Sequence, residues 1–160
     1  MSLVFTALIR TLIGLVPAIL LTSPLFGVSI LKLGLPLFML FFSLYIFGIT
    51  LGLIVSSGLI RYGPSFENIA WSSLFLLAPL GCIYYPIEIL PEFFQVIAKG
   101  LPLVYIFDET RNILINGLVD YENIKQAYLL NLVYLIFGIG LFYLSFLRAR
   151  IKGTLINMGE

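Results

Sequence analysis

The sequence contains no histidine and a single cysteine, Cys82. Intramolecular disulfides and metal sites built from cysteine and histidine are therefore excluded, as are catalytic triads that use a histidine base. No glycine-rich loop ending in Lys-Ser or Lys-Thr occurs, so any ATP that drives this protein must be bound by another chain. These absences predict that the chain is not an enzyme and carries no cofactor.

Charge is scarce as well. Charged residues make up 11% of the 160 residues, against roughly 25% in soluble globular proteins. Hydrophobic residues make up 61%, and nine lysines and arginines nearly balance eight acidic residues. This composition excludes a soluble globule and a disordered chain, and the lack of a positive field excludes binding to nucleic acid. We expect an all-α integral membrane protein with a single transmembrane domain over residues 1–160.

Long runs without charge mark the expected membrane spans, because an ionised side chain at the bilayer centre costs about 2.5–3.5 kcal/mol. Runs near or above the ~20 residues that cross ~30 Å of hydrocarbon predict four spans. The spans are expected at about residues 3–22, 34–60, 68–87 and 126–147. A cleaved signal peptide is the alternative for the first of them, although no small-residue cleavage site follows it.

Orientation follows from the end of the chain. Arg148, Arg150 and Lys152 directly follow the last expected span. Because cytoplasmic loops carry an excess of positive charge, this cluster is expected in the cytoplasm. With four crossings both termini are then cytoplasmic, and residues 88–125 are external.

The second expected span carries small residues at intervals of four, namely Gly48, Gly52 and Ser56. Small residues let two helix backbones approach closely in a membrane. The spacing predicts that this face packs against another helix, either within a bundle or across a dimer.

Residues 88–125 are too polar to cross a bilayer and too apolar for a solvated loop. Proline and glycine divide them into two short amphipathic helices, expected at residues 92–99 and 103–116, with Gly117 ending the second. We expect this re-entrant segment to dip into the outer leaflet, where irregular backbone is tolerated only if protein or water covers it.

A series of spaced residues in the stretch 58–114 forms a pattern. It comprises a small residue, an aromatic pair and proline, then an aliphatic residue with proline, an amphipathic helix, and a Leu-Pro step before an acidic residue and arginine. These positions are Gly81, Tyr84, Tyr85, Pro86, Leu90, Pro91, Leu101, Pro102, Asp108 and Arg111. The pattern resembles the membrane subunit of type-2 ATP-binding-cassette (ABC) transporters. Glu109 departs from it, since the family carries a small residue there.

The resemblance implies a membrane domain of six helices, of which this chain corresponds to the last four. It implies that two such domains surround a translocation path above separate ATPase subunits. The chain would then be the permease component of an ATP-driven exporter, with an ABC ATP-binding subunit, a second permease copy or paralogue, and membrane lipid as its partners. The alternative is an accessory or assembly membrane subunit that transports nothing itself.

The short loop at residues 61–68 is expected on the cytoplasmic face, between the second and third spans. Docking on the ATPase is one interpretation of this loop, and a tight turn that merely joins two helices is the other. The residues expected to make the docking contacts are Arg61, Tyr62, Phe66 and Glu67.

An outer gate is the corresponding interpretation of the re-entrant segment. Its prolines turn the chain away from the third span, and its apolar residues can cover the external end of the path. The alternative is that they only cap the bundle against lipid, and that Asp108 and Arg111 form a local ion pair three residues apart. The residues assigned to the gate are Gly81, Pro86, Pro91, Phe93, Phe94, Pro102, Asp108 and Arg111, and its apolar faces also include Ile97, Val104 and Phe107.

Overall fold

The computed structural model describes residues 5–6, 9–11, 13–14, 17 and 34–152. The chain divides into two compact units, Met1–Phe38 and Met39–Glu160. The first expected span, at residues 3–22, lies largely outside the described residues. In the part of the chain that the structure describes from residue 34 onward, six helices make up the regular structure, and the expected all-α class is confirmed.

Two of these helices are long and apolar enough to cross a membrane: α2 (Gly34–Tyr62, 29 residues) and α6 (Tyr121–Lys152, 32 residues). They contain the expected spans at 34–60 and 126–147. Only 22% of the most apolar stretch of α2 and 11% of that of α6 is buried within the structure. Most of their apolar surface is therefore not covered by the described chain.

From Met39 onward, α2 packs against α6 along a seam that combines small and polar residues. The Asn131 Nδ2 group of α6 donates hydrogen bonds to the carbonyl oxygen of Ser43 at 2.9 Å and to its Oγ at 2.8 Å. Gly138 of α6 lies so close to Thr50 that an added Cβ would be 3.4 Å from the Thr50 Cγ2. Small and polar residues at such a seam let the two backbones approach closely.

The expected packing face of α2 points elsewhere. Gly48 and Gly52 are exposed, and no described atom lies within 4 Å of a Cβ built on either of them. Ser56 is half-buried. The residues of α2 that contact α6 belong to the opposite side of the helix, so the prediction that the Gly48 face packs against another helix stays a prediction.

The third helix, α3 (Phe66–Leu80), is shorter than expected, because it ends seven residues before the expected boundary at 87. That boundary was wrong because it relied on the absence of charge, and the chain from Gly81 to Pro86 is uncharged but no longer helical. Pro79 lacks a backbone donor, and Cys82 has a positive φ of 53°, which a right-handed helix cannot accommodate. With 15 residues α3 is about 22 Å long.

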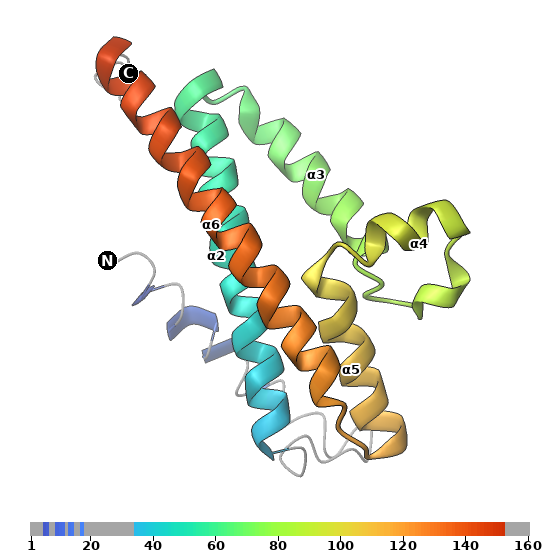
Figure 1. Ribbon diagram of the computed structural model, residues 1–160. Helices are drawn as coiled ribbons and strands as arrows, with labels where there is room; N and C mark the ends of the chain where they lie inside the picture. The colour runs from blue at the N-terminus through green and yellow to red at the C-terminus, as the bar shows by residue number, and fades with distance from the viewer. Residues whose placement is uncertain (1–4, 7–8, 12, 15–16, 18–33, 153–160) are drawn as a thin grey trace. The chain divides into compact units, whose positions relative to one another are not determined.

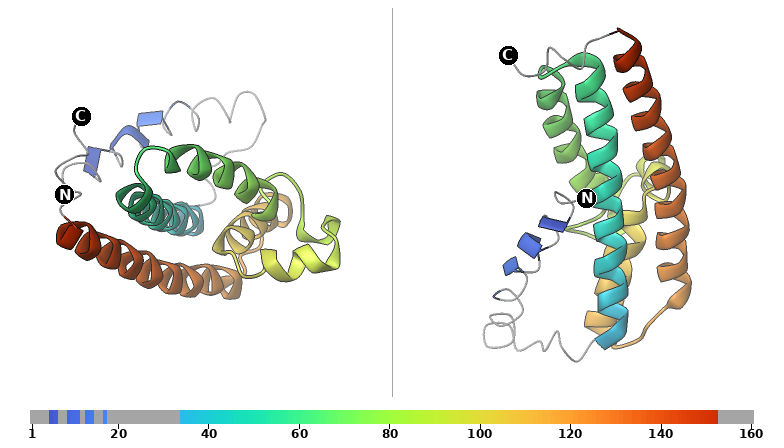
Figure 2. Two further views of the ribbon diagram at one scale, coloured as in Figure 1. Left: turned by 90° about the horizontal axis from the view of Figure 1, so that it is seen from above. Right: turned by 90° about the vertical axis from the view of Figure 1, so that its left-hand side faces the viewer.

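After α3 the chain forms a short 3-10 helix, η2 (Ile87–Ile89), followed by α4 (Glu92–Ala98) and α5 (Pro102–Asn116). The two expected short helices are thereby confirmed to within one residue at each end. Gly117 ends α5 with a left-handed φ of 68°, as expected. Helix α5 runs beside the N-terminal half of α6, whereas α4 extends to the side of both (Figures 1 and 2).

Candidate functional site

The segment of residues 81–101, which we call the break, interrupts the helical path between α3 and α5. It has a small apolar core of its own, formed by Cys82 and Ala98 at 0% exposure and Val104 of α5 at 4%. Four partly buried residues pack against this core, namely Tyr85, Ile87, Leu90 and Leu101. The break is thus a packed structure, although most of its backbone is irregular.

Gly81 sits where the end of α3 meets the start of α5. A Cβ at this position would lie 2.8 Å from the Leu103 Cδ1 and 2.9 Å from the carbonyl oxygen of Leu77. Pro102, at the first position of α5, is buried beside it. Of the residues assigned to a gate, these two are therefore part of the joint between α3 and α5.

Pro86 and Pro91 flank η2 in extended conformation, with ψ angles of 156° and 146°. A proline fixes φ and removes a donor, so neither α3 nor η2 can continue through these positions. The two prolines hold the chain in the turns that carry it from α3 through η2 into α4, as expected from the sequence.

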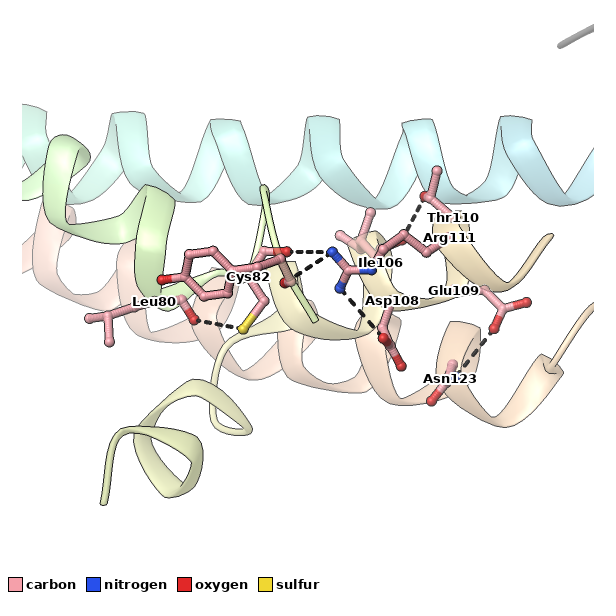
Figure 3. Close-up of polar contacts among 9 residues, drawn as sticks. Leu80, Cys82, Ile106, Asp108, Glu109, Thr110, Arg111 and Asn123 are labelled. Carbon is pink, nitrogen blue, oxygen red and sulfur yellow. Dashed lines mark hydrogen bonds and ion pairs between the residues drawn. The ribbon is translucent and has the colours of Figure 1, made fainter. Parts of the chain in front are cut away.

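Arg111 of α5 makes the contacts that hold the break against α5. Its Nη1 group donates to the carbonyl oxygens of Cys82 at 2.9 Å and Tyr85 at 3.0 Å (Figure 3). Its Nη2 group pairs with the Asp108 Oδ1 at 3.5 Å, which confirms the expected local ion pair. The backbone contacts were missed, because nothing in a single sequence relates residues 26 and 29 positions apart.

Other side chains bind further carbonyl groups at the end of α3 and in the break in the same way. The Tyr85 hydroxyl donates to the carbonyl oxygen of Pro79 at 2.9 Å, and the Gln95 Nε2 donates to that of Leu90 at 2.8 Å. The hydroxyls of Tyr105 and Tyr134 donate to the carbonyl oxygens of Lys99 and Gly100, both at 3.1 Å. These carbonyl groups thus obtain donors from side chains of the chain itself.

Glu109 joins α5 to the start of α6. It is 0% exposed, and its Oε1 accepts a hydrogen bond from the backbone N–H of Asp120 at 2.8 Å. Its Oε2 accepts one from the Asn123 Nδ2 at 3.2 Å (Figure 3). Both oxygens of the buried carboxylate are therefore satisfied without a cation. The sequence marked Glu109 only as a departure from a family pattern.

The apolar residues assigned to the gate differ widely in exposure. Phe93 of α4 is 72% exposed, and Phe94 and Ile97 are each 44% exposed. Val104 is buried in the core of the break, and Phe107 is half-buried on α5. Helix α5 packs its apolar side inward against α6 and the break, while the apolar side of α4 stays uncovered, and the outer gate stays a prediction.

The loop between α2 and α3 is a tight turn, with Gly63 in a left-handed conformation at φ 74°. The Phe66 ring occupies the space beside Gly58 and stacks on Tyr62 at 5.8 Å between ring centroids. The Arg61 guanidinium lies 5.3 Å from the centroid of the Tyr62 ring. Phe66 thus packs within the turn, whereas Arg61, Tyr62 and Glu67 are exposed.

Among the described residues, no group of three or more histidine, cysteine, aspartate or glutamate side chains is placed to hold a metal ion. Comparisons of the chain with models of protein families, with curated proteins and with solved structures give no match.

Proposed function

We propose that this chain is the membrane-embedded permease subunit of an exporter whose energy comes from a separate ABC ATP-binding subunit. One observation carries the proposal: between two helices long enough to span a bilayer, a third helix stops short, and side chains bind the carbonyl groups of the irregular backbone that follows. Such a broken helix is the kind of element with which transporters line a path through a membrane.

Exposure of α2 and α6 supports embedding in a membrane. A long apolar helix in the core of a soluble protein is mostly buried, whereas the apolar stretches of α2 and α6 are 22% and 11% buried. The charge-free part of α6, residues 126–147, is about 33 Å long, close to the thickness of the hydrocarbon layer. Lipid chains are the solvent that such a surface requires.

The length of α3 supports a break at membrane depth. At about 22 Å, α3 is too short to cross ~30 Å of hydrocarbon, so the backbone leaves its helical ladder before it reaches the far side. An unsatisfied carbonyl group costs several kcal/mol there, whereas in water it would be solvated. The donors from Arg111, Tyr105 and Tyr134 meet this requirement.

In this proposal both termini are cytoplasmic, because Arg148 and Arg150 near the end of α6 mark the cytoplasmic side. The turn between α2 and α3 lies toward the same end as the C-terminus of α6 (Figures 1 and 2). The ATPase docks on its exposed residues Arg61, Tyr62 and Glu67. A stiff turn that joins two helices can pass the movement of the ATPase to both of them.

A second permease copy or paralogue completes the path on the open side of α2, where Gly48 and Gly52 leave room for a close helix. The break then forms the outer gate, with Pro86, Pro91 and Pro102 setting its turns and Arg111 holding it to α5. Phe93 and Phe94 on the uncovered side of α4 face the path or the lipid.

Co-purification tests the function. The chain is purified from native membranes, and we expect an ATP-hydrolysing subunit to accompany it and to hydrolyse ATP faster in its presence. Glu67→Lys should lower recovery of that subunit about tenfold, equivalent to losing one good charged contact. Glu122→Lys is the matched control, because it reverses an exposed carboxylate at the other end of the molecule.

Absence of any ATPase from the purified protein, or equal losses for both variants, would contradict the proposal. Recovery of an ATPase whose rate is unchanged would favour the accessory subunit instead. Orientation is tested separately with Asn116→Cys, which should react with an impermeant thiol reagent only from outside the cell. Cys82 is fully buried and is replaced by alanine to give a cysteine-free background.

A further inference from the structure

Lys99, Gly100 and Leu101 form the short turn that joins α4 to α5. The side chain of Lys99 is exposed. No carboxylate pairs with its ammonium group among the described residues, where the ion pairs are those of Arg111 with Asp108 and of Lys125 with Glu122. Lys99 is thus an uncompensated cation in the turn between α4 and α5.

A contact with α6 shows how deep this turn lies along the helix axis. The Tyr134 hydroxyl donates to the carbonyl oxygen of Gly100, next to Lys99. Tyr134 lies eight residues beyond Gln126, where the charge-free part of α6 begins, and therefore about 12 Å along the helix axis. In the proposed membrane arrangement, the backbone of Lys99 lies well inside the hydrocarbon layer. An ammonium at such a depth is costly unless an anion or water meets it.

Carboxylates of the molecule do not fill this role. Glu92 lies on the same side of α4, but it is seven residues away, about 10 Å along the axis. On α5, Asp108 pairs with Arg111, and both oxygens of Glu109 accept hydrogen bonds from other groups. An anion that neutralises Lys99 must therefore come from outside the described chain.

The surroundings of Lys99 indicate what kind of anion fits. Phe93 and Val96 lie three residues apart on α4, and Lys99 follows at the same spacing as the residue that caps the end of the helix. Phe93 and Val96 are 72% and 75% exposed, so an open apolar strip leads up to the ammonium group. A charged head beside Lys99 and an apolar chain along this strip are matched together by an amphipathic anion.

We propose that Lys99 is a binding site for the anionic head of an amphipathic molecule, a phosphate or carboxylate attached to an apolar chain that lies along Phe93 and Val96. An ammonium group binds such an oxyanion as a point charge, and the interaction is strong where water is scarce. The inference deepens the proposed permease function and rests on it, because it names the class of molecule that the gate would contact.

The test measures lipid retained by the purified chain, without an ATPase, by native mass spectrometry with phosphatidylglycerol and phosphatidylcholine as competing probes. We expect the chain to retain phosphatidylglycerol about tenfold better than phosphatidylcholine, as one charge-assisted contact would give. Lys99→Gln and Lys99→Met should bring that ratio close to one, and Lys99→Arg should preserve it. Lys125→Gln is the matched control, since it removes an exposed lysine that already has a partner.

A preference that survives in both Lys99→Gln and Lys99→Met, or an equal loss in Lys125→Gln, would overturn the site. Inorganic phosphate at millimolar concentration should not displace phosphatidylglycerol. If it does, the claim that the apolar strip contributes to binding is overturned. The Lys99 side chain makes no hydrogen bond or ion pair within the described chain, so these variants should unfold at the temperature of the unaltered protein. If the chain shows no preference for phosphatidylglycerol but an ATPase still co-purifies, this site is ruled out and the permease function stands. If the preference is present but no ATPase co-purifies, only the permease function is ruled out.

Discussion

Polar contacts occur both in the seam between α2 and α6 and in the break between α3 and α5, but they have different roles in the two regions. In the seam the backbones are regular helices whose N–H and C=O groups satisfy one another, so Asn131 and Ser43 only add to packing. One atom of the seam, the Asn131 Oδ1, is buried and has no hydrogen-bond partner among the described residues. In the break, Arg111, Tyr105 and Tyr134 bind carbonyl groups that have lost their helical donors. Polar side chains are therefore optional in the first region and required in the second.

Of the four substitutions that compare the two regions, Arg111→Met should destabilise the protein most. It leaves the carbonyl oxygens of Cys82 and Tyr85 without donors, and each buried acceptor left unsatisfied costs about 1–3 kcal/mol. We expect the free energy of unfolding in mixed micelles to fall by about 3 kcal/mol. Lys125→Met, which removes an exposed partner of Glu122, is the control and should change little. Equal losses in the two variants would show that the carbonyl contacts are not required.

Glu109→Gln tests the contact that joins α5 to the start of α6. One carboxylate oxygen becomes an NH₂ group, Asn123 has to turn its amide so that its Oδ1 accepts from that group, and neither hydrogen bond is charge-assisted any longer. We expect a loss of about 2 kcal/mol in the free energy of unfolding. Glu122→Gln, on an exposed side chain nearby, provides the comparison. A loss no greater than that of Glu122→Gln would mean that the two hydrogen bonds at Glu109 contribute nothing.

Gly81→Ala compares the packing of the break with that of α2. The added methyl group would meet Leu103 and the carbonyl oxygen of Leu77, and overpacking of this kind costs about 1–3 kcal/mol. Gly48→Ala on α2 meets no described atom within 4 Å and should be neutral or slightly stabilising in the isolated chain. Thermal unfolding of both variants measures the difference. A destabilising Gly48→Ala would instead indicate that another helix already occupies that face.

Asn131→Ala should have the smallest effect of the four, although Asn131, at 1% exposure, is more deeply buried than Arg111, whose side chain is 26% exposed. Interhelical hydrogen bonds in membrane proteins contribute about 0.6 kcal/mol on average. We expect the free energy of unfolding to fall by about that value. A double-mutant cycle of Asn131→Ala with Ser43→Ala should show that the two substitutions are coupled. If Asn131→Ala destabilised the protein as much as Arg111→Met, the distinction between the two regions would fail.

Elements that depend on local patterns were predicted well. The spans at 34–60 and 126–147 fall within α2 and α6, because a charge-free run of this length favours a long apolar helix. The helices at 92–99 and 103–116 and the end at Gly117 follow from proline and glycine at their boundaries. The end of α3 was missed, because the positive φ of Cys82 has no signature in its residue type.

Composition, charge spacing and the positions of proline and glycine determined by themselves that this chain is helical, where its long apolar helices lie, and that the α3–α5 region turns. These properties depend on near neighbours in the chain. Only the tertiary structure decided that Arg111 binds the carbonyl groups of Cys82 and Tyr85, that Glu109 joins α5 to α6, and that Tyr134 holds the turn beside Lys99. Irregular backbone takes its donors from whichever side chains the packing of distant helices brings within reach, and a single sequence contains no periodic signal for such partners.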